Sequence, residues 1–416
     1  MSVELASRMA EMRTSEIREI LKLTQKPGMI SFAGGMPAAE LFPVQRVARV
    51  TEEVLARDGY RALQYSTTEG DPALREAIVE RMNRVLGTDV RRDEILITSG
   101  SQQGLDLSGK LFLDEGDVVL CESPTYLGAI NALRAYRPRF VEVPTDSDGM
   151  VITELEKCLA ANDRVKLVYV VPEFQNPTGR TWSLERRQAF LEVVARHNLP
   201  VLEDSPYAEL RFEGVAVPSL KTLDSNGLVV FLGTFSKTFC PGLRVGWLAA
   251  ERALRERYVM IKQGADLHTS TLCQRQVAVY LELFDLEADI ERIRDTYRRR
   301  RDVMLGTMEE AFPPGIVYNR PQGGMFLWIE LPDGTDARKV LERSLGQNVA
   351  FVPGSSFYPN GGHENTMRLN FSAMPEERIR DGVRRLALVL GELLEEAGKG
   401  ALRAEVPAAA GRTLGR

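Results

Sequence analysis

The sequence predicts an α/β fold in which a mainly parallel β-sheet lies between layers of helices. Short apolar runs alternate with helical patterns of ten or more residues, which is the arrangement that parallel sheets require. Polar clusters follow directly where these apolar runs end, at 94–98, 118–121, 166–171, 200–202 and 228–232. Because ligands bind beyond the carboxyl ends of the strands in such sheets, this coincidence predicts one shared site.

The pattern changes after about residue 275, which predicts a second, smaller α+β domain. A long polar helix is expected over 271–312, followed by alternating stretches at 324–330 and 366–371 and a helix after Pro375. We therefore divide the chain into an N-terminal arm that belongs partly to the small domain, a large domain, a small C-terminal domain and a flexible tail. Their ranges are 1–45, 46–295, 296–397 and 398–416, respectively.

Composition excludes several classes of protein. The chain has 416 residues, of which 44% are hydrophobic, so it can bury large cores. Its net charge of −5 argues against nucleic acid or an anionic membrane as the main partner. The four cysteines form no CxxC pair, which predicts a reducing compartment and no metal site. No apolar run approaches the roughly 20 residues of a membrane span, so we expect a cytoplasmic protein.

The segment 233–246 is the most informative stretch of the chain. It reads Gly-Thr-Phe-Ser-Lys-Thr-Phe-Cys-Pro-Gly-Leu-Arg-Val-Gly and follows a predicted strand. It places hydroxyl groups, the amine of Lys237 and the guanidinium of Arg244 on one loop. A phosphorylated aldehyde cofactor needs these groups, because the amine bonds to the aldehyde, hydroxyls donate to the phosphate and a cation neutralises it. A lone lysine on an exposed loop is the alternative interpretation.

Polar residues at the other strand ends suit the same cofactor. Ser101 and Gln102 open a helix, where free amides favour an anion, although small residues there also make tight turns. Asp204 could pair with a pyridine nitrogen or cap a helix. Tyr207 could donate to the phenolic oxygen of the ring together with Asn176, unless the Asn-Pro-Thr-Gly run is simply a turn.

Two more residues extend this pattern. Tyr126 follows a proline after a predicted strand, where it could stack on the face of the cofactor or pack in the core. Arg368 lies in a predicted strand of the smaller domain and could hold a carboxylate with two hydrogen bonds. Taken together, in this order and at these strand ends, the residues predict a cofactor site.

The chain resembles the fold-type-I pyridoxal-phosphate aminotransferases of class I/II over residues 13–390. The resemblance rests on the motifs Ser101-Gln102-Gln103, Asn176-Pro177-Thr178-Gly179, Asp204-x-x-Tyr207 and Ser236-Lys237-x-x-x-Pro241-Gly242-Leu243-Arg244. Within the group the chain is most similar to 2-aminoadipate aminotransferases and their relatives, including kynurenine and aromatic aminotransferases. The stretches that resemble this subgroup are 17–24, 32–37, 64–66, 262–269 and 364–369.

The resemblance implies a role for each matching position. Lys237 would bind pyridoxal 5′-phosphate covalently and then move the proton of the substrate Cα, while Asp204 pairs with the pyridine nitrogen. Asn176 and Tyr207 would bind the phenolic oxygen, and Tyr126 would stack on the ring. The catalytic residues are therefore expected to be Lys237, Asp204 and Tyr207. The residues expected to hold the phosphate are Ser101, Gln102, Thr234, Ser236 and Arg244.

The resemblance also implies a substrate site and a partner subunit. Arg368 and Asn176 would hold the substrate α-carboxylate, and Gly35 would line the pocket. Tyr65 is expected to reach the phosphate from the partner subunit, so the functional unit would be a homodimer. No metal is implied.

The N-terminal arm would cover the pocket, by the same resemblance. Arg18 lies on this arm and would meet the distal carboxylate of acidic substrates. The alternative is that Arg18 pairs with Glu19 or Glu16 on a solvated helix.

The predicted activity is transfer of an amino group from an L-α-amino acid to a 2-oxoacid such as 2-oxoglutarate, in ping-pong order. The expected donors are 2-aminoadipate, glutamate, leucine or aromatic amino acids. Lysine is a good base only if its pKa falls below the free value of ~10.4, and burial beside Arg244 would lower the pKa of Lys237.

Two other classes of function stay open. One is a pyridoxal-phosphate lyase or decarboxylase, which would need no 2-oxoacid. The other is a regulator with an added DNA-binding domain, for which the roughly 30 residues before Phe32 leave too little room.

Overall fold

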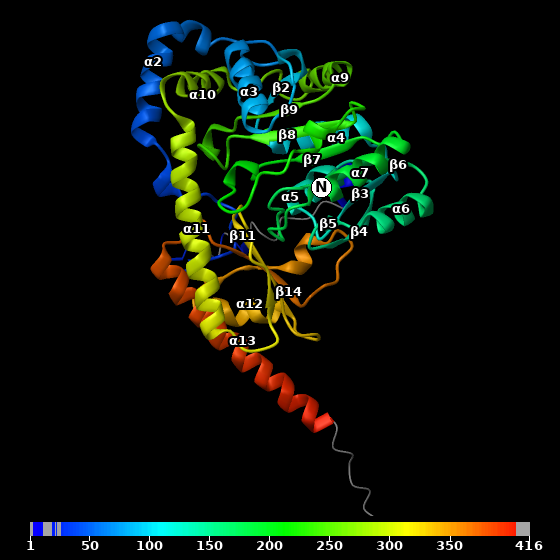
Figure 1. Ribbon diagram of the computed structural model, residues 1–416, viewed down its shortest axis with the longest axis vertical. Helices are drawn as coiled ribbons and strands as arrows, with labels where there is room; N and C mark the ends of the chain where they lie inside the picture. The colour runs from blue at the N-terminus through cyan, green and yellow to red at the C-terminus, as the bar shows by residue number, and fades with distance from the viewer. Residues whose placement is uncertain (1–2, 11–18, 21, 23–25, 405–416) are drawn as a thin grey trace, which may run out of the picture.

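The computed structural model describes residues 3–10, 19–20, 22 and 26–404, and it confirms the predicted α/β fold (Figure 1). An eight-stranded sheet has the strand order β2-β9-β8-β7-β6-β3-β4-β5. Its strands are β2 (Ile95–Thr98), β9 (Gly246–Ala249), β8 (Val229–Thr234), β7 (Val201–Asp204), β6 (Val165–Val170), β3 (Val118–Ser123), β4 (Arg139–Asp146) and β5 (Gly149–Met150).

The directions of these strands bring their ends to one edge. The pairs β4–β3, β3–β6, β6–β7 and β7–β8 are all parallel. Strand β9 runs antiparallel to both β2 and β8, and β5 forms a hairpin with β4. The prediction of a mainly parallel sheet is therefore confirmed, and the carboxyl ends of β2, β3, β6, β7 and β8 lie along the same edge.

Helices cover both faces of the large sheet, and their apolar side chains form the cores beneath them. One face carries α4 (Ser101–Phe112), α5 (Leu127–Arg134) and α9 (Arg252–Gln263). The opposite face carries α2 (Val44–Ala62), α3 (Pro72–Val85), α6 (Ile152–Ala161), α7 (Leu184–Arg196), α8 (Leu220–Leu223) and α10 (Thr271–Leu283). The Ser183 side chain accepts a hydrogen bond from the backbone N–H of Arg186 and caps α7.

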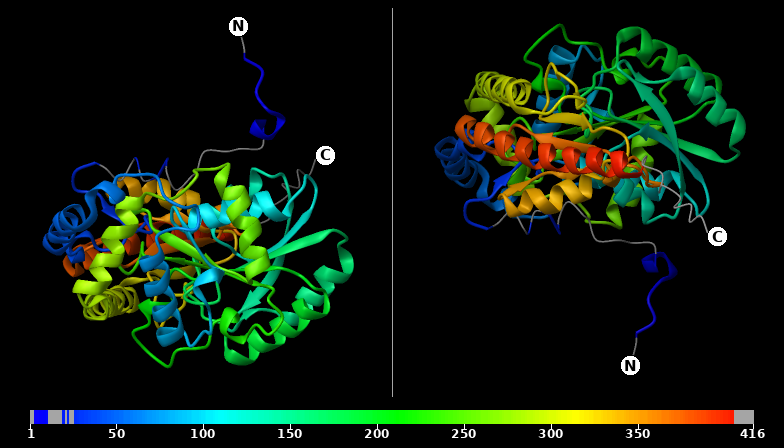
Figure 2. Two further views of the ribbon diagram at one scale, coloured as in Figure 1. Left: turned by 90° about the horizontal axis from the view of Figure 1, so that it is seen from above. Right: turned by 90° about the horizontal axis from the view of Figure 1, so that it is seen from below.

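A smaller α+β part lies below the large sheet in Figure 1. Its four-stranded sheet has the order β10-β11-β14-β13, and a two-stranded sheet pairs β1 with β12. The strands are β1 (Ile30–Ser31), β10 (Val317–Tyr318), β11 (Phe326–Glu330), β12 (Val349–Ala350), β13 (Val352–Pro353) and β14 (Thr366–Asn370). The helices α12 (Ala337–Gly346) and α13 (Glu376–Ala404) pack against each other beside these strands (Figure 2).

The prediction of one helix over 271–312 is wrong. Helix α10 ends at Leu283, Phe284 is extended, and α11 (Leu286–Ala311) begins after Asp285. The Asp285 carboxylate accepts from two backbone N–H groups of the first turn of α11, so it acts as an N-cap. Helical patterns on both sides hide this short break in the sequence.

The predicted domain boundary at 295/296 falls inside α11, which runs beside both parts of the molecule (Figure 1). The four-part division therefore remains a prediction. At the C-terminal end, α13 continues through residues 398–404. Residues 405–416 lie outside the described part of the chain.

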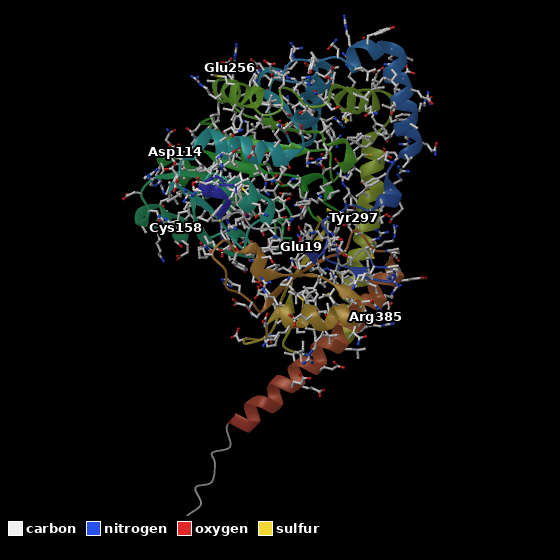
Figure 3. The ribbon with its side chains drawn as sticks, turned by 180° about the vertical axis from the view of Figure 1, so that it is seen from behind. Glu19, Asp114, Cys158, Glu256, Tyr297 and Arg385 are labelled. Atoms are coloured by element: carbon white, nitrogen blue, oxygen red, sulfur yellow. The ribbon has the colours of Figure 1, made fainter. Side chains whose placement is uncertain are left out.

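The segment that leaves β1 connects the small part to the large one. The Phe32 carbonyl oxygen accepts from the Asn370 backbone N–H at 2.8 Å. The Ala38 backbone N–H donates to the Tyr297 hydroxyl on α11 at 3.0 Å, and Tyr297 is labelled in Figure 3. Residues 33–36 are thereby fixed above the carboxyl edge of the large sheet. Among the described residues, no helix is both long enough and apolar enough to cross a membrane.

Candidate active site

A cavity of about 310 Å³ lies at the carboxyl edge of the large sheet. It contains every predicted site residue except Tyr65 and Arg18. Its lining consists of Gly35, Met36, Ser101, Gln102, Tyr126, Val171, Asn176, Asp204, Pro206, Tyr207, Thr234, Ser236, Lys237, Pro241, Arg244 and Arg368. The structure therefore brings together residues that are more than 300 positions apart in the chain.

Asp204 ends β7 and is buried at the bottom of this cavity. Its Oδ2 accepts a hydrogen bond from the Tyr169 hydroxyl at 2.9 Å, whereas its buried Oδ1 has no partner among the described residues. Burial raises the pKa of Asp204 to about 7, against the opposing effects of the Tyr169 hydrogen bond and the Lys237 charge. A cationic N–H donor at Oδ1 would satisfy this oxygen and keep the carboxylate ionised.

Lys237 follows β8 and faces the same cavity. Its Nζ donates to the Gly35 carbonyl oxygen at 2.7 Å. Burial, with the charges of Arg368 and Arg244, lowers the pKa of Lys237 to about 8. An amine with this pKa can lose its proton near neutral pH, which is what both a nucleophile and a proton carrier require.

Hydroxyl and guanidinium groups form one wall of the cavity. The Thr234 hydroxyl donates to the Ser236 hydroxyl at 2.9 Å, and the Arg244 Nη1 donates to the Ser236 oxygen at 3.4 Å. Arg244 has a left-handed φ of 55°, which turns its side chain back toward the end of β2. These side chains can donate several hydrogen bonds to one anion.

The first residues of α4 complete this wall. Gly100 has a φ of 76°, and a Cβ at this position would collide with Arg244 Nη2. Only glycine therefore lets the guanidinium approach the free N–H groups at the start of the helix. We call Gly100–Gln102, Thr234, Ser236 and Arg244 together the phosphate cup. Gln102 itself is exposed, and its side-chain amide donates to the Gly128 carbonyl oxygen at 2.9 Å.

Asn176 connects two other candidate residues. Its Nδ2 donates to the Tyr207 hydroxyl oxygen at 3.4 Å, and its Oδ1 accepts from Arg368 Nη1 at 2.7 Å. The Arg368 Nη2 donates to the Ala33 carbonyl oxygen at 2.6 Å, while Nε has no partner among the described residues. Burial lowers the pKa of Arg368 to about 10, so the side chain remains a cation at neutral pH.

Half-buried Tyr126 also lines the cavity. Burial, aided by the charge of Asp204, raises the pKa of Tyr126 to about 12, so its hydroxyl stays neutral. Burial also raises the pKa of Tyr207 well above its usual value. Both phenols can therefore donate hydrogen bonds at neutral pH.

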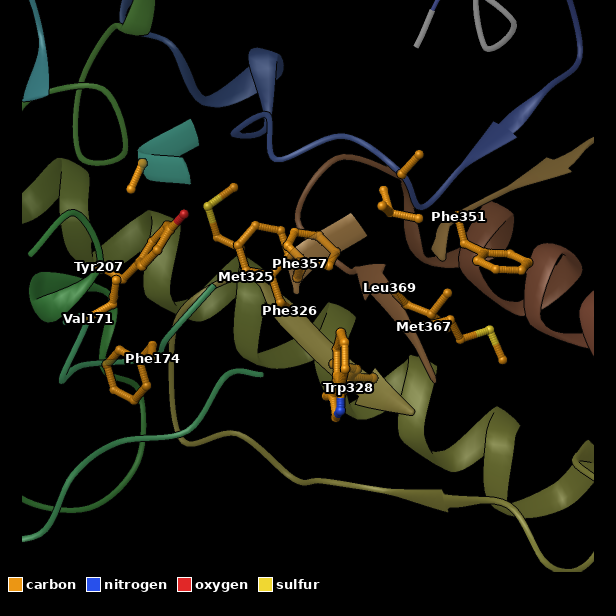
Figure 4. Packing of buried hydrophobic residues seen from close by; sticks show 14 of the residues in the cluster. Val171, Phe174, Tyr207, Met325, Phe326, Trp328, Phe351, Phe357, Met367 and Leu369 are labelled. Atoms are coloured by element: carbon orange, nitrogen blue, oxygen red, sulfur yellow. The ribbon is translucent and has the colours of Figure 1, made fainter. Parts of the chain in front are cut away.

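Sequence reasoning missed Phe326, which packs against three candidate residues. Figure 4 shows its ring near that of Tyr207, one of the three. The Arg368 guanidinium lies 4.3 Å from the centre of the Phe326 ring, and Tyr207 meets this ring edge-on at 5.8 Å. A Cβ at Gly35 would lie 3.3 Å from the same ring. In the sequence, the only indication that Phe326 lies near the site is the pair of glycines before its strand, in the run Gly-Gly-Met-Phe at 323–326. Tyr169 was also missed, because it lies within an apolar run.

Tyr65 and Arg18 are not placed in this cavity. Tyr65 is 79% exposed, and its ring meets His268 edge-on at 5.8 Å. Arg18 lies outside the described residues. The roles assigned to the other residues from the sequence remain predictions at this point, although their positions converge.

The fold and this cavity define a cofactor-dependent enzyme of the α/β class, and comparison with known proteins gives its family. The family model for aminotransferase class I and II matches residues 27–386, so the chain belongs to this family. Class I and II aminotransferases use pyridoxal phosphate, act on amino acids and 2-oxoacids, and run their two half-reactions in ping-pong order.

Individual relatives agree with this assignment. The chain is 43% identical to aromatic-amino-acid aminotransferase 1 of Thermococcus litoralis, over 92% of this chain and 93% of the relative. It is 46% identical to 2-aminoadipate transaminase of Thermus thermophilus, over 92% and 95%. The solved α-aminoadipate aminotransferase LysN of Thermus thermophilus, complexed with N-(5′-phosphopyridoxyl)-L-leucine, superposes with a TM-score of 0.87 at 42% identity, over 94% and 98%.

The cavity fits pyridoxal phosphate on structural grounds. The unpartnered Asp204 Oδ1 suits a protonated ring nitrogen, the phosphate cup suits a dianion, and Lys237 lies within the same cavity. When bound, the cofactor withdraws electrons from the substrate Cα, so that the Cα proton can leave.

We predict that Lys237 titrates far below an ordinary lysine in the cofactor-free protein. An NMR titration with ¹³C at lysine Cε should give a midpoint near pH 8, because burial and two nearby cations disfavour the charged amine. Arg368→Gln should raise this midpoint, since one of those cations is removed. Lys237→Gln assigns the signal, and exposed Lys157 serves as the internal reference. A Lys237 midpoint at the ordinary lysine value would contradict the prediction.

Proposed function

We propose that this aminotransferase moves the amino group of 2-aminoadipate, glutamate, leucine or an aromatic amino acid to a 2-oxoacid, with 2-oxoglutarate as the main acceptor. The observation that carries the proposal is the convergence of Lys237, Asp204 and Arg368 on one cavity. An amine, a buried carboxylate and a buried guanidinium provide a proton carrier, a partner for the ring nitrogen and a carboxylate receptor.

Lys237 has the central chemical role in this proposal. Its Nζ would hold the cofactor and, once the substrate has displaced it, would carry the proton that leaves the substrate Cα. The lowered pKa of Lys237 makes both proton transfers possible near neutral pH. Asp204 would keep the ring nitrogen protonated, and Asn176 and Tyr207 would hold the phenolic oxygen. Tyr126 would support the ring, and the phosphate cup would hold the phosphate.

The α-carboxylate of the substrate is assigned to Arg368 and Asn176, above Gly35. Arg368 is held between the rings of Phe326 and Phe357, at 4.3 and 4.9 Å from their centres. This packing leaves the guanidinium edge, with its unpartnered Nε, as the polar surface of the side chain. A planar carboxylate matches that edge through two parallel hydrogen bonds.

The proposed substrate range follows from the rest of the lining. The described cations of the cavity are Lys237, Arg244 and Arg368, and each already has a role. A second carboxylate on an acidic substrate therefore needs another cation, which we assign to Arg18. Met36 and Val171 offer apolar surface for leucine-type or aromatic side chains. The similar aromatic-amino-acid aminotransferase, the similar 2-aminoadipate transaminase and the phosphopyridoxyl-leucine complex of LysN support the same range.

We further propose a homodimer in which Tyr65 reaches the phosphate of the partner subunit. Large apolar side chains are exposed near Tyr65 along α2 and its C-terminal end, including Leu55 (44%), Tyr60 (98%) and Leu63 (71%). A dimer contact there would bury this surface, which a monomer would leave in water. We also propose a cytoplasmic location, in line with the four unpaired cysteines.

Spectroscopy of the purified protein tests the proposed activity. The aldehyde band of the bound cofactor should fade on addition of 2-aminoadipate or leucine and return on addition of 2-oxoglutarate. Lys237→Ala should lose turnover by several orders of magnitude but still bind pyridoxal phosphate through the phosphate cup. Arg18→Ala should lower activity on 2-aminoadipate relative to leucine.

If the aldehyde band returned without any 2-oxoacid, the result would contradict the proposal and favour a lyase. An Arg18→Ala variant with unchanged relative activity on acidic substrates would contradict only the role of Arg18.

Mixing two inactive or weakened variants tests the position of Tyr65. In a mixed dimer of Lys237→Ala and Tyr65→Ala subunits, one site contains an intact Lys237 and, if Tyr65 acts across the interface, an intact partner tyrosine. Affinity for pyridoxal phosphate at that site should then equal that of the natural protein, while the Tyr65→Ala homodimer binds it about tenfold more weakly. Failure of the mixture to restore affinity would mean that Tyr65 does not act across the interface.

A further inference from the structure

A buried cation lies behind the phosphate cup, outside the cavity lining. Lys262 is in the last turn of α9, which packs against α4, and its side chain is fully buried. Its Nζ donates to both oxygens of Asp266 at 2.6 and 2.8 Å, to Gln103 Oε1 at 2.9 Å and to Thr269 Oγ1 at 3.2 Å. A desolvated ammonium group is costly, so this complete set of oxygen partners keeps it charged.

The partners of Lys262 hold the turn between β2 and α4. Asp266 Oδ2 accepts from the Ser99 hydroxyl at 3.1 Å and from Gln103 Nε2 at 2.7 Å. Gln103 Oε1, which already accepts from Lys262, also accepts from the Ser99 backbone N–H at 2.8 Å. Ser99 is therefore fixed through both its main chain and its side chain, and both connections lead back to the Lys262–Asp266 pair.

Ser99 is directly connected to the phosphate cup. Its carbonyl oxygen accepts from Arg244 Nη2 at 3.4 Å, and the next residue is Gly100, with its positive φ. The cup has little space to adjust, because a Cβ at Gly246 would lie 2.8 Å from the Ser101 backbone nitrogen. A small shift of Ser99 would therefore change the directions of the N–H groups at the start of α4 and of the Arg244 guanidinium.

We propose that Lys262 and Asp266 form a positioning pair that sets the geometry of the phosphate cup and so makes the protein select phosphorylated over non-phosphorylated cofactor. This inference rests on the proposed function, in which the cup holds the phosphate. Lys262 does not line the cavity, and its charge is balanced by Asp266, so it acts through the turn that it holds and not by direct attraction.

The protonation states of the pair agree with this arrangement. Burial opposes ionisation of Asp266, but hydrogen bonds from Lys262, Gln103 and Ser99 outweigh it and lower the pKa of Asp266. Burial lowers the pKa of Lys262, and Asp266 partly offsets that effect. Asp266 therefore stays ionised at neutral pH, and its carboxylate favours the charged form of the Lys262 amine.

Binding of two ligands that differ only in the phosphate tests the proposal. Dissociation constants of pyridoxal 5′-phosphate and of pyridoxal are measured by absorbance on the cofactor-free full-length protein. Lys262→Met should weaken binding of pyridoxal phosphate about tenfold, as expected for disturbed charge-assisted hydrogen bonds, and leave pyridoxal binding unchanged within about twofold. Asp266→Asn should change the ratio of the two dissociation constants in the same direction. The ³¹P chemical shift of the bound phosphate should move in both variants.

Lys157→Met is the matched control. Lys157 is exposed and pairs only with Glu154 on its own helix, so both dissociation constants and the ³¹P shift should stay as in the natural protein.

Three results would overturn the inference. Unchanged dissociation constants for both ligands in Lys262→Met would show that the pair does not position the cup. An equal loss for both ligands would show a general structural role only. If Lys262→Met does not fold, an unchanged ratio in Asp266→Asn decides against the proposal. By contrast, a natural protein that binds pyridoxal phosphate no better than pyridoxal would contradict the proposed function itself.

Discussion

The rest of the site depends on one unusual interaction, the burial of Asp204 with one oxygen satisfied and the other open. Two other carboxylates in strands of the same sheet, Glu122 in β3 and Glu203 in β7, are also buried, and burial raises the pKa of each to about 7. Glu122 accepts from the Val171 N–H and the Trp182 Nε1, and Glu203 accepts from two backbone N–H groups at the start of α8. Those two carboxylates have structural partners on both oxygens, whereas Asp204 keeps Oδ1 free toward the cavity. A buried carboxylate oxygen without a partner in a residue that lines a cavity marks a candidate ligand contact.

The charges around Asp204 are complementary to an anionic cofactor and an anionic substrate. Arg244, Lys237 and Arg368 line the cavity, and Asp204 is the one carboxylate among its described lining residues. Burial of the amine, together with repulsion from the two guanidinium groups, disfavours the protonated amine and lowers the pKa of Lys237 to about 8. Binding of a phosphate and a carboxylate would relieve this repulsion. The same arrangement thus supports tight binding and keeps the amine ready to accept a proton.

Much of this could be predicted from the sequence, because parallel strands bring their carboxyl ends to one edge. Asp204, Asn176 and Lys237 each follow an apolar run, so their convergence follows from the topology alone. Contacts that depend on side-chain direction could not be predicted. Tyr169 resembles a core residue in its strand, and only the pairing of β6 with β7 brings its hydroxyl to Asp204. Lys262 lies in a stretch that the resemblance includes, but nothing in the sequence indicates that its side chain is buried.

The errors have equally specific causes. The break between α10 and α11 consists of two residues within a continuous helical pattern, and only the cap formed by Asp285 reveals it. Phe326 was missed because a single aromatic residue in a strand normally indicates a core position, and here it also supports Arg368 and Tyr207. The roles of Tyr65 and Arg18 stay predictions, because Tyr65 is exposed in the single chain and Arg18 lies outside the described residues.

The most direct test of the central claim is the ¹⁵N NMR shift of the pyridine nitrogen in labelled cofactor bound to the protein. If Asp204 Oδ1 is the partner of that nitrogen, the shift should be that of a protonated pyridine in the natural protein across neutral pH. In Asp204→Ala it should change to that of an unprotonated ring. An unprotonated nitrogen in the natural protein, or the same shift in both proteins, would contradict the role of the buried carboxylate.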